Sequence, residues 1–365
     1  MITGLGSVND LVSDKKGAFY NTLEEFHKYW ERIDIISPSI KGYDSGVKNI
    51  FGNVYIHISP LPLIFHPIWF LIKGLEIYRE HKFDLMTVHE FPPFYNGIGA
   101  RLLWNKIRVP YILEILHIPG YPTPADSKEK VYKNLMKWFI RFDASRARAI
   151  RVMNKSQVPE FLIKAGVPKD KIVHIPAVYV DLEIFKPMNL PKKYDLIFVG
   201  RLAENKGIGL LLEAIRSLKH QIPNIKCLIV GDGPLKKSLS LEISHLSLRN
   251  NIIMHGYAKD SSEIAKLINE SKILVMPSYN EGGPRVVVEA MACGVPVLAT
   301  PVGIVPDVIN SAGMLIDWNS EDIAEKAKKI LGNYETYRNS GLETAKQFER
   351  KEAIKNYAEQ IKKLI

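Results

Sequence analysis

The feature of this sequence that most constrains its fold is a regular alternation of short, β-branched apolar runs with segments of helical periodicity. Continuous apolar strands that alternate with helices are typical of a parallel sheet covered on both faces. The expected helices include Ala18–Trp30, Gly209–His220, Ser261–Ser271 and Ser320–Leu331. The expected strands are Ile33–Ser37, Leu85–His89, Tyr111–His117, Ala149–Met153, Ile172–Ile175, Asp195–Gly200, Lys226–Gly231, Asn251–Gly256, Ile273–Pro277, Val295–Thr300 and Met314–Ile316. The sequence therefore predicts an α/β protein with parallel sheets.

The alternation breaks at residues 186–193, where two prolines and three lysines show no periodicity. A segment of this kind is typical of a linker between domains. We expect two doubly wound Rossmann-like domains, residues 1–188 and residues 189–347, that face each other across a cleft. Residues 348–365 are expected to form a helix that packs back toward the first domain. Because ligands of open α/β sheets bind beyond the carboxyl ends of the strands, we expect the active site in that cleft.

The composition narrows the class of protein. Hydrophobic residues make up 46% of the chain and charged residues 24%, which excludes a disordered, collagen-like or coiled-coil chain. A formal net charge of +10 favours anionic partners, whether phosphorylated small molecules, acidic lipids or nucleic acid. The two cysteines fit a reducing compartment better than a disulfide framework. We find no secretory signal, and the most apolar stretch, Pro60–Ile72, is too short to span a bilayer. We expect a cytoplasmic protein, at most at the inner face of a membrane.

Two loops in the second half carry residues suited to an anionic ligand. The first, residues 200–207, follows an apolar strand and contains Arg201 and Lys206 between two glycines. Arginine offers a planar fork to phosphate oxygens and lysine a compact charge, although a solvated polar loop could have the same pattern. The second loop precedes a short predicted helix, Pro284–Cys293, with Gly282 and Gly283 before it. Amides left unobstructed at the start of a helix form a site for anions.

Glu281 and Glu289 frame the start of this predicted helix. Glu281 lies on the loop, and Glu289 lies roughly 7–8 Å along the helix axis. This arrangement suits a nucleoside diphosphate sugar. Its diphosphate would rest on the helix start and be neutralised by Arg201 and Lys206. Glu289 would accept hydrogen bonds from the ribose, and Glu281 from the sugar. The alternative is that Glu281 caps the helix and Glu289 is a surface residue.

These motifs resemble those of glycosyltransferase family 4 (glycosyl transferases group 1), a group of retaining enzymes with the GT-B fold. The resemblance is dense from Asp195 to Asp317 and includes residues 200–207, 231–234, 289–297 and 301–307, with seven residues between Glu281 and Glu289. It implies that Glu281 contacts the transferred sugar and Glu289 the ribose. It also implies that the segment around Tyr257 contacts the nucleobase. Gly283 and Arg285 depart from the family, which commonly has an aromatic and an aliphatic residue there.

The first half carries weaker signals for an acceptor site. Gly17, between a short expected strand, Ile2–Val8, and the first expected helix, resembles the glycine-rich acceptor loop of the family. His117 follows an expected strand and resembles the family's histidine near the donor sugar and the acceptor, although a lone histidine is commonly structural. Glu90 also follows a strand and could orient or deprotonate an acceptor hydroxyl, or could belong to a plain polar loop.

Two further segments suggest contact with a membrane. Residues 128–155 contain nine basic and two acidic residues interleaved with apolar and aromatic side chains. Such a segment could lie on anionic lipid, or it could be an ordinary domain helix with solvated lysines. Residues 60–78 are expected to form a second interfacial element.

We expect a retaining, hexosyltransferase-like enzyme that moves a sugar from a UDP- or GDP-sugar to a hydroxyl of a glycan or lipid-linked acceptor. The resemblance implies that the leaving phosphate helps to take the acceptor proton. We expect no cofactor and no metal, because the sequence lacks the Asp-x-Asp pair with which many glycosyltransferases hold a divalent ion. The alternatives are a nucleotide-sugar epimerase or phosphorylase on the same fold, a catalytically inactive sugar-binding relative, or a basic nucleic-acid-binding protein.

Overall fold

The computed structural model describes residues 1, 8, 11–12, 17–90 and 92–365, and the chain divides into two compact units. Unit 1 comprises residues 1–118, 131–177 and 354–365, and unit 2 comprises residues 119–130 and 178–353. The sequence analysis instead divides the chain after residue 188. The two divisions differ because residues 178–180 are buried, and the amide of Val180 donates to the carbonyl of Phe348, 2.7 Å away in unit 2.

Unit 2 is a Rossmann-like layer of parallel strands between helices. Its six-stranded sheet has the order β10-β9-β8-β11-β12-β13, and every pair is parallel. The strands are β8 (Tyr194–Val199), β9 (Cys227–Val230), β10 (Ile252–Gly256), β11 (Ser271–Met276), β12 (Val297–Ala299) and β13 (Gly313–Leu315). The helices are η4 (Glu204–Lys206), α7 (Ile208–Gln221), α8 (Lys236–His245), α9 (Ser261–Asn269), α10 (Arg285–Ala292), α11 (Val305–Val308), α12 (Ser320–Gly332), α13 (Tyr334–Ala345) and η5 (Lys346–Phe348).

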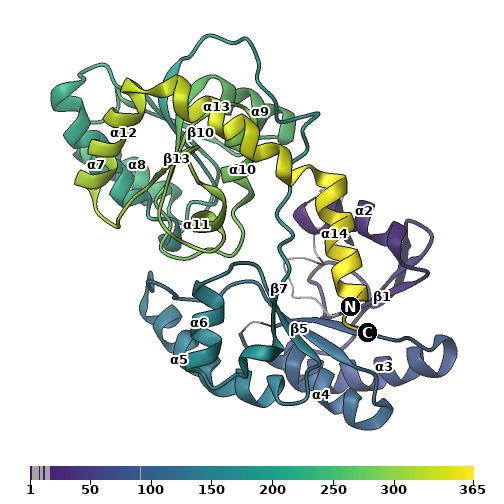
Figure 1. Cartoon of the computed structure of the whole chain (residues 1–365). Helices are drawn as coiled ribbons and strands as arrows, with labels where there is room; N and C mark the ends of the chain where they lie inside the picture. The colour runs from purple at the N-terminus through teal and green to yellow at the C-terminus, as the bar shows by residue number, and fades with distance from the viewer. Residues whose placement is uncertain (2–7, 9–10, 13–16, 91) are drawn as a thin grey trace. The chain divides into compact units, whose positions relative to one another are not determined.

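The core of unit 2 explains why its strands are apolar throughout. Along β8, Leu196 and Phe198 pack with α7, α8 and α12 in one buried cluster, while Ile197 between them is also buried. Figure 1 shows α7, α8 and α12 on one side of the sheet and α9 and α10 on the other. A strand covered on both faces has no polar alternation. The expected strands after residue 190 are all present, with ends within two residues of those predicted.

Unit 1 contains two hydrogen-bonded sheets among its described residues, with the orders β1-β3-β2 and β4-β5-β6-β7. Its strands are β1 (Ile33–Ser37), β2 (Gly46–Ile50), β3 (Val54–Ile58), β4 (Met86–His89), β5 (Tyr111–Ile115), β6 (Ala149–Val152) and β7 (Ile172–His174). Its helices are α2 (Ala18–Phe26), η1 (His27–Tyr29), η2 (Leu63–Phe65), α3 (His66–His81), α4 (Tyr95–Ile107), α5 (Ser127–Ala144), α6 (Gln157–Lys164) and η3 (Lys169–Lys171). The first four residues of α5, residues 127–130, belong to unit 2.

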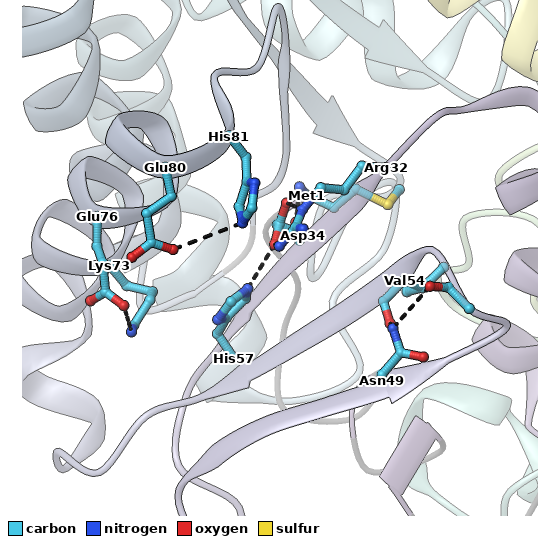
Figure 2. Close-up of polar contacts among 11 residues, drawn as sticks. Met1, Arg32, Asp34, Asn49, Val54, His57, Lys73, Glu76, Glu80 and His81 are labelled. Carbon is cyan, nitrogen blue, oxygen red and sulfur yellow. Dashed lines mark hydrogen bonds and ion pairs between the residues drawn. The ribbon is translucent and has the colours of Figure 1, made fainter.

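One strand pair of unit 1 departs from the expected parallel pairing, because β2 pairs antiparallel with β3. The sequence analysis did not recognise this hairpin. Almost all of β2 is exposed, so it has no apolar run, and the turn uses positive φ angles at Phe51 and Gly52. In Figure 2, Asn49 closes the turn by donating its side-chain amide to the carbonyl of Val54, 3.3 Å away. Of the expected strand Ile2–Val8, only Val8 lies within the described residues.

An ion-pair cluster fixes β1 against β3. Figure 2 shows Asp34 between Arg32 and His57, with contacts of 2.8 Å from Arg32 Nε to Oδ2 and 2.8 Å from His57 Nε2 to Oδ1. Burial works to raise the pKa of Asp34, but the hydrogen bonds from His57 and Arg32 outweigh it and hold the pKa well below its usual range. The carboxylate of Asp34 is therefore ionised at neutral pH.

The C-terminal helix α14 (Arg350–Lys362) contributes its residues from 354 onward to unit 1. The hydroxyl of Tyr357 donates to the buried Glu114 of β5 over 2.7 Å, and its ring stacks on Phe26. Arg151 of β6 donates to the same Glu114 oxygen over 2.6 Å, and His89 Nε2 lies 2.5 Å from the other. Glu114 of β5 thus links the neighbouring strands β4 and β6 to the last helix, α14. Within the part of the chain that the structure describes, no helix is long and apolar enough to cross a membrane.

Candidate functional site

Two loops at the carboxyl ends of β8 and β11 are held against each other in unit 2. The amide of Tyr279 donates to the carbonyl of Asn205 over 2.8 Å. Gly207 has φ +63°, and a Cβ at this position would lie 2.0 Å from the carbonyl oxygen of Pro277. Any other residue at 207 would force the loops apart. Gly207, the second of the two glycines of the first loop, therefore serves to bring Lys206 next to the second loop.

Lys206 and Glu281 form a direct ion pair between the loops. Their side chains are 22% and 15% exposed, so water screens the pair only in part. The hydroxyl of Ser278 donates to the same Glu281 oxygen over 3.1 Å. The predicted phosphate-binding cation and the predicted sugar-binding acid thus neutralise each other in this structure.

Helix α10 begins beside this ion pair, at Arg285, and Pro284 is the residue before it rather than its first residue. Within the described residues, no backbone carbonyl accepts a hydrogen bond from the amides of Arg285 and Val286. The preceding loop is fixed, because the carbonyl of Gly282 accepts from the amide of Ile304 over 3.0 Å. The start of α10 therefore presents unpaired amides and the positive end of the helix dipole.

A pocket of about 280 Å³ opens at the start of α10. Five of the residues that line it are Lys206, Glu281, Pro284, Arg285 and Glu289. Its apolar walls include Phe185, Phe198 and Ile264. The pocket combines two cations, two acids and open helix amides, which is the set of groups that an anionic ligand with several hydroxyls requires.

Glu289 faces this pocket from the first turns of α10. Burial raises the pKa of Glu289, and the nearby charge of Arg285 opposes the rise. The guanidinium of Arg285 lies 5.1 Å from the centre of the Tyr179 ring, a cation–π contact that anchors it beside Glu289. A buried carboxylate is stabilised when it accepts hydrogen bonds from ligand hydroxyls, because these replace the hydrogen bonds with water that it lost on burial.

Four predicted donor-site residues do not line this pocket: Arg201, Tyr257, Gly282 and Gly283. Arg201 is exposed on the first loop, and Tyr257 is 71% exposed after β10. Gly282 and Gly283 are half-buried in the loop before α10. These four positions stay predictions for contacts with a bound ligand.

The acceptor-side residues lie in unit 1, at the ends of β4 and β5 and the start of α2. Gly17 precedes α2, and the ring of Phe19 lies 6.0 Å from that of His89 at the end of β4. His117 is exposed two residues beyond β5, which ends at Ile115 rather than at the predicted His117.

Glu90, in contrast, is buried, with 3% of its surface exposed. Its carboxylate accepts a hydrogen bond from the amide of Gly97 in the first turn of α4. This contact caps α4, so Glu90 has a structural role in addition to the predicted contact with an acceptor.

Ser278 and Arg285 are among the pocket residues that the sequence analysis missed. Ser278 is fully buried and donates to Glu281, and a serine before a polar loop gives no signal of its own. Arg285 was noted as a departure from the family but was given no role. A cation at the first position of a helix, where the dipole disfavours positive charge, is the signal that could have identified it.

Comparison with known families matches residues 181–347 to the family described as glycosyl transferases group 1. An uncharacterized glycosyltransferase of Methanocaldococcus jannaschii is 29% identical over 336 residues, which cover 88% of this chain and 87% of that protein. A second uncharacterized glycosyltransferase of the same organism is 30% identical over 304 residues, covering 77% of this chain and 71% of its own length.

Solved structures share the fold of the whole chain. Sucrose-phosphate synthase from Thermosynechococcus elongatus has a TM-score of 0.80 at 20% identity and covers 100% of this chain and 96% of its own. The Anabaena protein HepE, in complex with UDP and glucose, has a TM-score of 0.74 at 17% identity and covers 99% of this chain and 98% of its own.

Proposed function

The chain belongs to the glycosyl transferases group 1 family and is a glycosyltransferase with two Rossmann-like units of the GT-B type, and from that premise we propose that it transfers a sugar from a nucleoside diphosphate sugar with retention of the anomeric configuration. The assignment to glycosyltransferase family 4 is part of this proposal. The observation that carries it is the pocket of unit 2, where Lys206, Glu281, Arg285 and Glu289 surround the open start of α10.

A bound donor would replace Glu281 as the partner of Lys206. A diphosphate group at the start of α10 competes with Glu281 for the ammonium group of Lys206. Once Lys206 turns to phosphate, the Glu281 carboxylate becomes an acceptor for sugar hydroxyls. Glu289 would accept hydrogen bonds from the ribose hydroxyls. These contacts leave its carboxylate away from the negatively charged diphosphate. The complex of HepE with UDP and glucose, on the same fold, supports a nucleotide donor of this class.

In the reaction, the bond between the anomeric carbon and the diphosphate breaks while negative charge grows on the leaving phosphate. Lys206, Arg201 and the amides of α10 stabilise that charge because they are fixed before the reaction begins. The acceptor hydroxyl attacks from the side of the leaving group and gives its proton to the leaving phosphate. No separate base is needed, and His117, through its resemblance to the family's histidine, is proposed to orient the acceptor.

We further propose that transfer does not need a divalent metal. The fixed cations and the helix dipole supply the charge that a metal ion would otherwise bring to the diphosphate. The sequence contains no Asp-x-Asp pair to hold such an ion. A cytoplasmic location is part of the same proposal, and the two buried, unpaired cysteines fit it.

The proposal is tested by thermal-shift measurements against a panel of nucleotide sugars, because a ligand that binds the folded state raises its melting temperature. The anomeric configuration of the product, read by NMR, tests retention. Incubating the donor without an acceptor separates the alternatives, since an epimerase would change the sugar and a phosphorylase would require free phosphate. A protein that none of these nucleotides stabilises would contradict the proposed donor site.

A further inference from the structure

Helix α5 carries a row of exposed apolar side chains in unit 1. They are Val131, Leu135, Trp138 and Phe142, with 55%, 42%, 83% and 48% of their surfaces exposed. Spacings of four, three and four residues place them along one face of the helix. The opposite face, with Met136 and Ile140, is fully buried. The helix thus has one apolar face in the core of the unit and a second one in contact with water, which is costly for a soluble protein.

A row of basic side chains runs beside this apolar row. Lys137 and Arg141 are exposed and lie four residues apart. At 100° per residue, their row is adjacent to that of Trp138 and Phe142. Residues 131–142 include no aspartate or glutamate. The exposed part of residues 131–142 therefore carries cationic but no anionic side chains beside the apolar row.

The two acidic residues of α5 lie outside this surface. Asp143 is fully buried. Glu129 accepts hydrogen bonds from the amide of Ala125 and the side chain of Asn280, at 2.7 and 2.8 Å. A further cation, Arg101 of α4, lies 3.7 Å from the centre of the Phe142 ring. The positive charge beside the apolar row is thus not neutralised by acids of its own helix.

We propose that this surface of α5, formed by Val131, Leu135, Trp138 and Phe142 with Lys137 and Arg141, docks on an anionic lipid bilayer. The helix would lie in the plane of the interface, with the apolar row among the upper acyl chains and the basic row at the lipid phosphates. Tryptophan favours this boundary because its ring is apolar and its N–H is polar. Figure 1 shows α5 beside α6 in unit 1.

The charge of α5 complements an anionic bilayer, and this distinguishes α5 from a second exposed apolar row on η2 and α3. Ile64 of η2 and Ile68 and Ile72 of α3 are also exposed, at 67%, 50% and 53%. However, α3 carries Glu76 and Glu80 as well as basic residues, so an anionic surface would repel part of it. The proposal is therefore restricted to α5. It does not depend on the proposed glycosyl transfer, since lipid binding involves neither a donor nor the pocket of unit 2.

The test is flotation of the full chain with vesicles of phosphatidylcholine alone and of phosphatidylcholine with phosphatidylglycerol. Binding is expected to anionic vesicles and to weaken with salt. Each basic side chain near an anionic surface contributes about 1 kcal/mol, or about fivefold in binding. The double variant Lys137→Gln/Arg141→Gln should therefore bind about 30-fold more weakly. Trp138 is the one exposed tryptophan of the five, so a blue shift of fluorescence that Trp138→Phe abolishes would report its insertion.

A matched control uses α8 of unit 2, where Leu241 is 74% exposed and Lys237 is exposed. Leu241→Ser/Lys237→Gln should bind vesicles as the wild type does, whereas Leu135→Ser/Trp138→Ser should lose binding. All variants should keep the wild-type melting temperature and its shift with nucleotide, which separates lipid binding from folding and from the donor site. Equal binding to neutral and anionic vesicles would overturn the proposal. So would no binding, or a wild-type dimer in sedimentation that Leu135→Ser/Trp138→Ser dissociates.

Discussion

Replacing Lys206 by alanine tests the role of the ion pair with Glu281 in binding the donor. The side chain of Lys206 is 22% exposed, so its charge acts in a site that excludes most water. Removing one preorganised group that stabilises the charge of the transition state costs about 2–4 kcal/mol. At about 1.4 kcal/mol for each factor of ten, kcat/KM for the donor should fall by about 30- to 700-fold.

The same substitution should also lower the stability of the protein without nucleotide, because it leaves the half-buried carboxylate of Glu281 without its cationic partner, with only the hydroxyl of Ser278 donating to it. A cost of about 1–3 kcal/mol is expected, between that of an exposed and of a buried pair. Glu281→Gln in the Lys206→Ala background should restore stability but not activity, since the lost cation is needed by the diphosphate. Stability and activity should respond differently because Lys206 has two roles: it neutralises Glu281 in the folded protein, and it binds the diphosphate of the donor.

The measurements are initial rates of nucleotide release over a range of donor concentrations and chemical unfolding of each variant. Lys237→Ala, at an exposed position of α8, is the control for removal of a positive charge from unit 2. A Lys206→Ala enzyme with kcat/KM within threefold of the wild type would refute the assignment. Restored activity in the double variant would refute it as well, because Lys206 would then serve only to neutralise Glu281.

Four other expectations follow from the structure. Glu289→Gln should raise the KM for the donor with a smaller effect on kcat, as measured by the same rates. A chelator should leave activity unchanged, and loss of activity that manganese restores would contradict the metal-free proposal. Glu114→Gln should destabilise the fold by about 3–5 kcal/mol in urea unfolding, because Arg151 loses its buried partner. Burial raises the pKa of Asp143 to about 7, with the charge of Arg101 opposing it. Its contribution to stability is therefore full below the unfolded pKa near 4 and is lost as the pH rises through 7. Asp143→Asn should gain about 3 kcal/mol relative to the wild type between pH 5 and pH 8, and a constant difference would show that Asp143 does not titrate there.

The strands of unit 2 could be predicted because each is buried on both faces. Burial on both faces requires a continuous run of apolar residues, and such a run is visible in the sequence. The β2–β3 hairpin of unit 1 could not, since β2 is exposed and its turn depends on a positive φ angle at Phe51, a residue that rarely adopts one. The sequence also gave no sign that residues 178–180 pack with unit 2, because that packing involves Phe348, far along the chain.

Within the site, residues near one another in sequence were easier to predict than their partners. Glu281, Pro284 and Glu289 lie on one loop and helix, and the pocket contains all three. Lys206 was expected to be available for phosphate, but its contact with Glu281 joins positions 75 residues apart. The burial of Glu90 likewise depends on α4, which no local pattern around Glu90 reveals. Long-range contacts of this kind are set by the tertiary fold.

The central claim is that the start of α10 holds the diphosphate of the donor. A crystal structure of the protein with a bound nucleoside diphosphate tests it most directly. The account predicts phosphate oxygens within hydrogen-bond distance of the amides of Arg285 and Val286, with Lys206 turned from Glu281 to phosphate and Glu289 on the ribose. A nucleotide bound elsewhere, with the Lys206–Glu281 pair intact, would contradict it.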